Sequence, residues 1–310
     1  MVNSVPTRRR FLKATSATAA ALAVPRFRSA HAATSAQTAD GTRLYYESHG
    51  TGAPIVFLHE ASRTCRSFDL QVAALEARFQ CILYNARGYP PSDVASSVES
   101  YSEDTAATDA GAILDALGLR DAHLVGVSMG SAAALQFSLR SASRVRSLIL
   151  CSIGAGSDLK PGEFANRMEA FAKRIEASEP QTLADLLGSL PDRQRLREKN
   201  PIEFRKFMEQ ASGLSRVGLA NTFRGVQARR PPIYVHKDGV AALTTPTLLI
   251  VGELDVQCIK PSQFLAETIR GARLETLTGT GHSVNIEEPA IINRLVADFV
   301  DAAEGKRTSR

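Results

Sequence analysis

The chain has 310 residues, of which 44% are hydrophobic and 22% are charged. This composition excludes a disordered or fibrous protein, and the length suffices for one large globular domain or two modest ones. The formal net charge of +5 would, taken alone, indicate an acidic partner such as nucleic acid. The distribution of the basic residues argues against that interpretation, because the excess positive charge lies in the first 32 residues.

The N-terminal segment is typical of an export signal. Residues 7–13 read TRRRFLK, residues 14–24 form an alanine-rich apolar stretch, and AHA at residues 30–32 fits a cleavage site. This pattern resembles a bacterial twin-arginine signal, so we predict a signal peptide over residues 1–32 that engages the twin-arginine translocase. A periplasmic or secreted protein would follow. The apolar stretch is too short for a stable membrane anchor, and a disordered basic tail that binds anions is the alternative.

Cleavage after Ala32 would change the charge balance. Six of the 37 basic residues and no acidic residue precede that point, which leaves 31 basic against 32 acidic residues and a net charge of −1. The mature chain then has no electrostatic reason to bind nucleic acid, and we expect a small-molecule substrate as its partner. The four cysteines (65, 81, 151 and 258) have no metal-binding spacing. Cys81 and Cys151 lie in apolar, strand-like runs, which favours free buried thiols over disulfides.

After the leader, strand patterns alternate with helical patterns. TADGTRLYYESHG predicts a hairpin that turns at Asp40 and Gly41. Short unbroken apolar runs, typical of buried parallel strands, follow at residues 55–58, 81–84, 123–127, 147–152, 247–251 and 274–278. Helical periodicity lies between them at residues 68–79, 106–117, 131–139, 262–269 and 289–300. This order predicts an α/β fold whose mostly parallel sheet is covered by helices on both faces.

Residues 157–239 interrupt this alternation with helical patterns alone. Three apolar stripes at helical spacing run through the block: Phe164, Met168, Phe171 and Ile175, then Leu183, Leu186, Leu187 and Leu190, and then residues 202–208. We interpret the block as a helical cap inserted after the sixth strand, with residues 33–156 and 240–310 as the core. The stripes could pack onto the core or face a substrate as a lid, and a helix can do both.

A candidate nucleophile follows the apolar run at residues 123–127. The segment LVGVSMG contains the pattern G-x-S-x-G, with Ser128 between an expected strand and an expected helix. In that context Ser128 lies on a sharp turn at the carboxyl edge of the sheet, and Gly126 and Gly130 leave room for the turn. The following helix presents its N-terminal N–H groups to an oxyanion. A small residue packed between a strand and a helix is the alternative.

A serine hydroxyl needs a base and an orienting acid. His282 lies in the glycine-flanked loop TGTGHSVNIEEP after the last expected strand. The segment TLLIVGELDVQC offers Asp255 after another strand, with Glu253 as the less favoured candidate. The chain order Ser128, Asp255, His282 differs from that of the other Ser-His-Asp folds and is the α/β-hydrolase order. A solvated loop histidine is the alternative for His282.

Four segments together resemble the α/β-hydrolase superfamily. They are LVGVSMG, the GELD loop, GTGHSVNIEEP and YNARGYPPSD at residues 84–93. The resemblance covers roughly residues 38–303. It implies the α/β-hydrolase fold with a helical cap after the sixth strand, and a Ser-His-Asp triad that uses neither cofactor nor metal. It also implies that the backbone N–H groups of Ala61 and Met129 form the oxyanion hole.

The loop FLHEASRTC departs from the pattern of that superfamily, which usually reads His-Gly after the third strand. His59 is present, but Glu60 replaces the glycine. A glutamate beside a developing oxyanion is unfavourable unless it points away or forms an ion pair, for which Arg63, Arg66 and Arg87 are candidates. His59, Glu60 and Arg63 are also possible substrate-binding residues, because Arg63 or Arg66 could bind a substrate carboxylate. Solvated loop arginines are the alternative.

These features predict an exported serine hydrolase that cleaves an ester, thioester or lactone through an acyl-enzyme. A cofactor-free haloperoxidase (perhydrolase) or a C–C-bond hydrolase would use the same triad. C–C hydrolases typically place tryptophan after the histidine, whereas this chain has Ser283 there and no tryptophan. Haloalkane dehalogenases and epoxide hydrolases are disfavoured because they carry aspartate in place of Ser128. A non-catalytic binding protein is the third hypothesis, and Glu60 is the feature that supports it.

Overall fold

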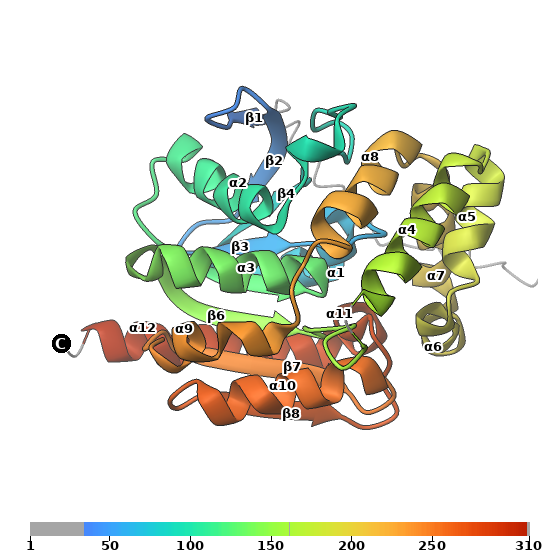
Figure 1. Ribbon diagram of the computed structural model, residues 1–310. Coiled ribbons are helices and arrows are strands. Elements are labelled where there is room, and N and C mark those ends of the chain that lie inside the picture. The colour runs from blue at the N-terminus through green and yellow to red at the C-terminus, as the bar shows by residue number, and fades with distance from the viewer. Residues whose placement is uncertain (1–33, 161, 309–310) are drawn as a thin grey trace, which may run out of the picture. The chain divides into compact units, whose positions relative to one another are not determined.

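A computed structural model describes residues 34–160 and 162–308, so the predicted signal peptide lies outside the described residues (Figure 1). Each apolar run of the sequence forms a strand, and the first segment forms the expected hairpin. The strands are β1 (Thr34–Gln37), β2 (Arg43–His49), β3 (Ala53–Leu58), β4 (Phe79–Tyr84), β5 (Ala122–Val127), β6 (Val145–Cys151), β7 (Thr247–Gly252) and β8 (Arg273–Leu277).

The strands form one sheet in the order β1-β2-β4-β3-β5-β6-β7-β8. β1 and β2 pair antiparallel, and β2 also pairs antiparallel with β4. The remaining neighbours are parallel, which brings the carboxyl ends of β3, β5, β6, β7 and β8 to one edge. The predicted mostly parallel sheet is confirmed, and the residues that follow these strands meet at that edge.

Helices connect the strands and cover the sheet on both faces. They are α1 (Asp69–Leu75), α2 (Glu103–Ala116), α3 (Met129–Arg140), α4 (Glu163–Glu176), α5 (Pro180–Gly188), α6 (Pro191–Lys199), α7 (Pro201–Ser212), α8 (Arg216–Asn221), α9 (Lys237–Ala241), α10 (Val256–Thr268), α11 (Val284–Glu287) and α12 (Pro289–Thr308). Side chains alternate along each strand, so Val56 and Leu58 of β3 pack with α2 and α3, while Ile55 and Phe57 pack with α1 and α12. None of the described helices is long and apolar enough to span a membrane.

Several helices differ in their bounds from the sequence-based expectation: α1 ends at Leu75 rather than at residue 79, and α12 continues to Thr308 rather than ending at residue 300. α10 begins at Val256, six residues before the expected start, and contains Pro261. Pro261 packs against Gly154, where an added Cβ would lie 2.3 Å from the proline Cβ. In α7 the predicted single stripe over residues 202–208 is wrong in part, because Ile202 is 58% exposed while Phe204 and Phe207 are buried.

The chain between β6 and β7 forms α4 to α9, at the place where the sequence predicts a helical insertion. In Figure 1, α4 to α8 gather at the end of the sheet toward which β6 points. On α4, Phe171 and Ile175 are buried in an apolar cluster with α5 and α7, and Met168 packs against the same cluster. The described core and the helices α4 to α9 belong to one compact unit, so the division into two domains stays a prediction.

Candidate active site

Ser128 lies on the turn between β5 and α3 with an unusual backbone conformation. Its φ is +54°, and among the described residues only Ser152 shares a positive φ without being glycine. Such a conformation is strained for a residue with a Cβ, so the surrounding structure must hold it. The Ser128 N–H donates to the Cys151 carbonyl at 2.9 Å, and Ser128 makes no side-chain cap hydrogen bond to α3. The hydroxyl is therefore not engaged in capping the helix that it precedes.

The two glycines of the motif allow this turn because β5, α3 and β3 approach each other closely. A Cβ on Gly126 would lie 2.5 Å from the backbone of Gly130 and Ser131. A Cβ on Gly130 would lie 2.0 Å from the Leu58 carbonyl oxygen. The sequence-based explanation of both glycines is confirmed, since neither position has room for a side chain.

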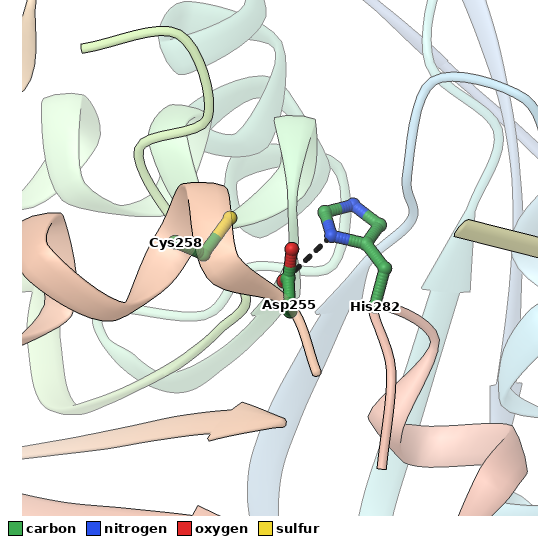
Figure 2. A group of neighbouring side chains, drawn as sticks. All are labelled: Asp255, Cys258 and His282. Carbon is green, nitrogen blue, oxygen red and sulfur yellow. Dashed lines mark hydrogen bonds and ion pairs between the residues drawn. The ribbon is translucent and has the colours of Figure 1, made fainter. Parts of the chain in front are cut away.

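Asp255 and His282 come from the ends of β7 and β8 and meet at the same edge (Figure 2). Asp255 Oδ2 accepts a hydrogen bond from His282 Nδ1 at 2.8 Å. Asp255 is the N-cap residue of α10 but makes no capping bond, so its carboxylate is directed to the imidazole. Glu253, the less favoured candidate, instead accepts from the Gly279 N–H at 2.8 Å. Of the two acids, Asp255 is the partner of His282.

The environment of this pair favours the charged form of both groups. Burial opposes ionisation of Asp255, yet the adjacent His282 lowers its pKa below the ordinary value. Burial likewise opposes protonation of His282, and the carboxylate outweighs it and raises the pKa of the imidazole well above the ordinary value. A carboxylate on Nδ1 fixes one proton there, so Nε2 is the atom that gains and loses the second proton.

One cavity of about 480 Å³ joins these residues. Ser128, Asp255 and His282 all line it, together with Glu60 and Ala61 from the loop after β3. The opposite wall comes from the helices between β6 and β7 and is largely apolar, with Phe164, Met168, Phe171 and Phe223 among its residues. The apolar stripe of α4 therefore packs among the neighbouring helices at Ile175 and lines the cavity at Phe164 and Met168.

The loop after β3 is held by side chains rather than exposed to solvent. The Ala86 N–H donates to His59 Nε2 at 3.0 Å, so His59 Nδ1 carries the proton and donates to the Glu60 carbonyl at 2.8 Å. Burial lowers the pKa of His59 to about 4, which keeps the ring neutral. The Tyr89 hydroxyl donates to the Ala61 carbonyl. These bonds fix the backbone of Ala61 beside the cavity, and Met129 occupies the first position of α3.

Glu60 forms a buried ion pair with two arginines. Its Oε1 lies 2.8 Å from Arg63 Nε, and its Oε2 lies 2.7 Å from Nη2 of Arg193 in α6. The three side chains are 2–3% exposed, and both guanidinium groups lie over the ring of Phe207. Ser62 and Ser283 accept further hydrogen bonds from Arg193. The cluster therefore connects the loop after β3 to α6.

The arginines keep Glu60 ionised despite its burial. Burial alone would raise the pKa of Glu60, but Arg193 and Arg63 outweigh it and lower the pKa to about 2. Burial lowers the pKa of Arg63 to about 10, against the attraction of Glu60. The charge of Glu60 is thus neutralised within the cluster, which removes the objection to a glutamate near an oxyanion site.

The sequence identified only part of this cluster. Pairing of Glu60 with Arg63 is confirmed, and the alternative of a solvated Arg63 is wrong because the residue is 3% exposed. Arg66 pairs with Glu47 and Asp69, and Arg87 pairs with Asp40 and Asp109, so neither neutralises Glu60. Sequence reasoning missed Arg193. The local sequence signal is that Arg193 precedes Leu196, the buried apolar residue of this polar helix, by three positions and so lies on the same face.

The predicted cysteines are free and buried, as expected for thiols in apolar runs. Cys258 lies beside Asp255 and His282, where its thiol donates to the Ser152 carbonyl at 3.3 Å (Figure 2). This contact follows from the register of α10, since Cys258 is one turn after Asp255. The sequence analysis did not predict that Cys258 would lie beside Asp255 and His282.

Comparison with known proteins agrees with this fold. A family model described as "alpha/beta hydrolase fold" matches residues 53–289, and the chain belongs to that family. The AB hydrolase superfamily protein YisY of Bacillus subtilis is 32% identical, over 85% of this chain and 97% of its own length. The 3-oxoadipate enol-lactonase 1 of Acinetobacter baylyi is 28% identical, over 81% and 89% respectively. A solved hydrolase from Pseudomonas aeruginosa superposes with a TM-score of 0.76 at 27% identity, covering 87% of this chain and 99% of its own.

Proposed function

We propose that the protein is a serine hydrolase that cleaves an ester, thioester or lactone of a small molecule. The observation that carries the proposal is the meeting of Ser128, on its strained turn, with the hydrogen-bonded pair Asp255–His282 at one cavity. Each element of nucleophilic catalysis then has a residue: a nucleophile, a base and an acid that orients the base.

The reaction proceeds in two halves. Ser128 Oγ attacks the carbonyl carbon while His282 Nε2 accepts the hydroxyl proton, and Asp255 stabilises the imidazolium. The tetrahedral oxyanion takes hydrogen bonds from the backbone N–H groups of Ala61 and Met129. His282 then gives its proton to the leaving alcohol or thiol, or to the ring oxygen of a lactone, and the acyl-enzyme forms. Water attacks that ester by the reverse of these steps, and acid is released.

The cavity indicates which substrates fit. Its walls carry Phe164, Met168, Phe171 and Phe223, which favours an apolar acyl or alcohol group. Gln227 is 5% exposed, lines the same cavity, and its Nε2 has no hydrogen-bond partner among the described residues. A buried amide donor without a partner favours a substrate with a second oxygen acceptor, because binding would satisfy it. The enol-lactonase relative gives a reason to include lactones in the assays.

A fluorophosphonate probe tests the assignment directly. We expect the probe to label the wild-type protein at Ser128, and labelling to disappear in Ser128→Ala. A panel of p-nitrophenyl esters of increasing chain length, with lactones beside it, then defines the substrate. If Ser128→Ala hydrolyses esters as fast as the wild type, the proposed nucleophile is wrong. If the wild type is neither labelled nor active but binds ligands, the fold serves as a binding protein.

We also propose that residues 1–32 direct export through the twin-arginine translocase to the periplasm. The support is the segment TRRRFLK followed by AHA at residues 30–32. Cell fractionation tests the proposal: the wild-type chain should be found in the periplasm in a cleaved form. The variant with Arg8→Lys and Arg9→Lys should stay inside the cell at full length. Export that is unaffected by both changes would contradict it.

A further inference from the structure

The hydrogen-bonded pair Asp255–His282 and the neighbouring Cys258 bring three potential metal ligands together. Cys258 Sγ, a carboxylate oxygen of Asp255 and a ring nitrogen of His282 all lie within 4.8 Å of one another. In the view of Figure 2 the Asp255 carboxylate lies between the Cys258 sulfur and the imidazole ring. The Cys258 side chain is fully buried, and those of Asp255 and His282 are 9–10% exposed. The mechanism described above uses the carboxylate and the imidazole but not the thiol.

The fold holds these three donors together rigidly. Asp255 is the N-cap residue of α10 and Cys258 follows three residues later, so both project from the first turn of one helix. His282 reaches the same point from the loop after β8, and its backbone carbonyl accepts a hydrogen bond from Ser152 Oγ at 2.8 Å. Ser152 also accepts the Cys258 thiol hydrogen through its own carbonyl. A site of this kind requires little rearrangement to bind an ion.

We propose that Cys258, Asp255 and His282 form an inhibitory binding site for Zn²⁺. Thiolate, imidazole and carboxylate are the donors that Zn²⁺ takes in proteins, at about 2.3 Å for sulfur and about 2.0–2.2 Å for nitrogen and oxygen. Around a tetrahedral ion such donors lie about 3–4 Å apart, a separation that follows from those bond lengths. The present spacing reaches that arrangement by small side-chain shifts. The fourth position would take water from the cavity.

The ion has a route to the site from solvent. Asp255 and His282 line both the cavity described above and a second cavity of about 350 Å³. The second cavity carries Asp192 and Glu198, against the single basic residue Arg195. Its excess of negative charge favours a cation over an anion.

Zinc at this site would stop catalysis by changing which imidazole nitrogen carries the proton. Binding of Nδ1 to the ion breaks the bond to Asp255, and the neutral ring then carries its proton on Nε2. A nitrogen that already holds a proton cannot accept the one from Ser128. On binding, the thiol loses its proton to solvent, and a protonated ring loses one proton as well, so the charge of the ion is balanced by the thiolate and the carboxylate. This consequence for activity rests on the proposed function, whereas binding of the metal does not.

Zinc inhibition of ester turnover is the first test. Each variant is compared with its own rate in the presence of a chelator, and Cys81→Ser serves as the matched control because Cys81 is another buried free thiol, in β4. We expect micromolar Zn²⁺ to inhibit the wild type and Cys81→Ser, reversibly with chelator. Cys258→Ser and Cys258→Ala should need at least about tenfold more Zn²⁺, since one of three ligands is lost. Millimolar Mg²⁺ should have no effect, because it prefers oxygen ligands.

Cadmium binding gives a second readout that needs no turnover. A thiolate bound to Cd²⁺ adds a charge-transfer band in the ultraviolet, which we expect in the wild type, in Cys81→Ser and in Ser128→Ala. The band should be absent in Cys258→Ser and Cys258→Ala. Absence of the band from the wild type, or equal zinc sensitivity of the wild type and both Cys258 variants, would overturn the site. If the wild type hydrolyses no ester, the proposed function fails and the band alone decides the metal site.

Discussion

The turn after β5 and the loop after β3 meet at the same cavity but are stabilised in different ways. The turn that carries Ser128 depends on its own motif, because Gly126 and Gly130 provide the close approach and the backbone provides the hydrogen bonds. The loop that carries Glu60 depends on Arg63 within the loop and also on Arg193, which is 133 residues away in the chain. A local motif can be identified from the sequence, whereas a charge neutralised by a distant helix requires the fold.

The largest expected effect is a loss of ester turnover in Ser128→Ala without a matching loss of folding stability. Replacing Ser128 by Ala should lower kcat/KM for esters by about 10⁴-fold or more, as loss of a nucleophile does. Stability should change by less than about 1 kcal/mol, because the hydroxyl makes no capping bond. Ester assays and urea unfolding measure the two quantities. A large loss of stability would mean that Ser128 has a structural role and would weaken the contrast between the two regions.

The second prediction concerns the loop after β3. Glu60→Gln should destabilise the protein by about 3–5 kcal/mol, because it removes the carboxylate that the two buried arginines Arg63 and Arg193 share. Urea unfolding measures the change. The double variant Glu60→Gln with Arg193→Met removes both partners and should cost less than the sum of the two single changes. Additive effects would show that the ion pair is not the interaction that holds the loop.

The third prediction uses pH to weaken the same pair. The pKa of Glu60 is about 2 in the folded protein against an ordinary value of 4.5. A lowered pKa contributes stability above the unfolded value, and that contribution is lost as the pH falls toward the folded value. The stability difference between wild type and Glu60→Gln should stay constant from pH 7 to about 5 and shrink by about 2 kcal/mol at pH 3. Unfolding of both proteins across this range measures it, and a constant difference would contradict the assignment.

The smallest expected effect comes from an exposed ion pair whose N–O distances are similar to those of the buried Glu60–Arg193 pair. Arg229 and Glu99 form two hydrogen bonds of 2.8 and 2.9 Å, yet the side chains are 49% and 73% exposed. Arg229→Ala should cost less than about 0.5 kcal/mol, because water screens exposed charges. Comparison of its unfolding midpoint with that of Glu60→Gln measures the effect of burial. A cost equal to that of Glu60→Gln would mean that burial is not the deciding factor.

The sequence predicted the strands well because buried parallel strands have unbroken apolar runs, as in HLVGV and TLLIV. It also predicted that Ser128, Asp255 and His282 lie together, because each follows a strand whose carboxyl end the parallel order brings to one edge, and all three line one cavity. It could not identify Arg193, because α6 also carries Arg195 and Arg197 and only packing determines which arginine faces Glu60. The start of α10 was missed because Pro261 interrupts the local helical pattern.

The link between Glu60 and Arg193 has a consequence for protein engineering. The helices between β6 and β7 form the apolar wall of the cavity, so exchanging them with those of a relative is an obvious way to alter substrate preference. A donor segment without an arginine at this place would remove one of the two partners of the buried Glu60 carboxylate and leave Arg63 alone opposite it. Such a chimera should have an altered cavity wall and, because the loop after β3 has lost a partner, a lower rate of turnover. A successful exchange must transplant the arginine with the helices, or restore glycine at position 60.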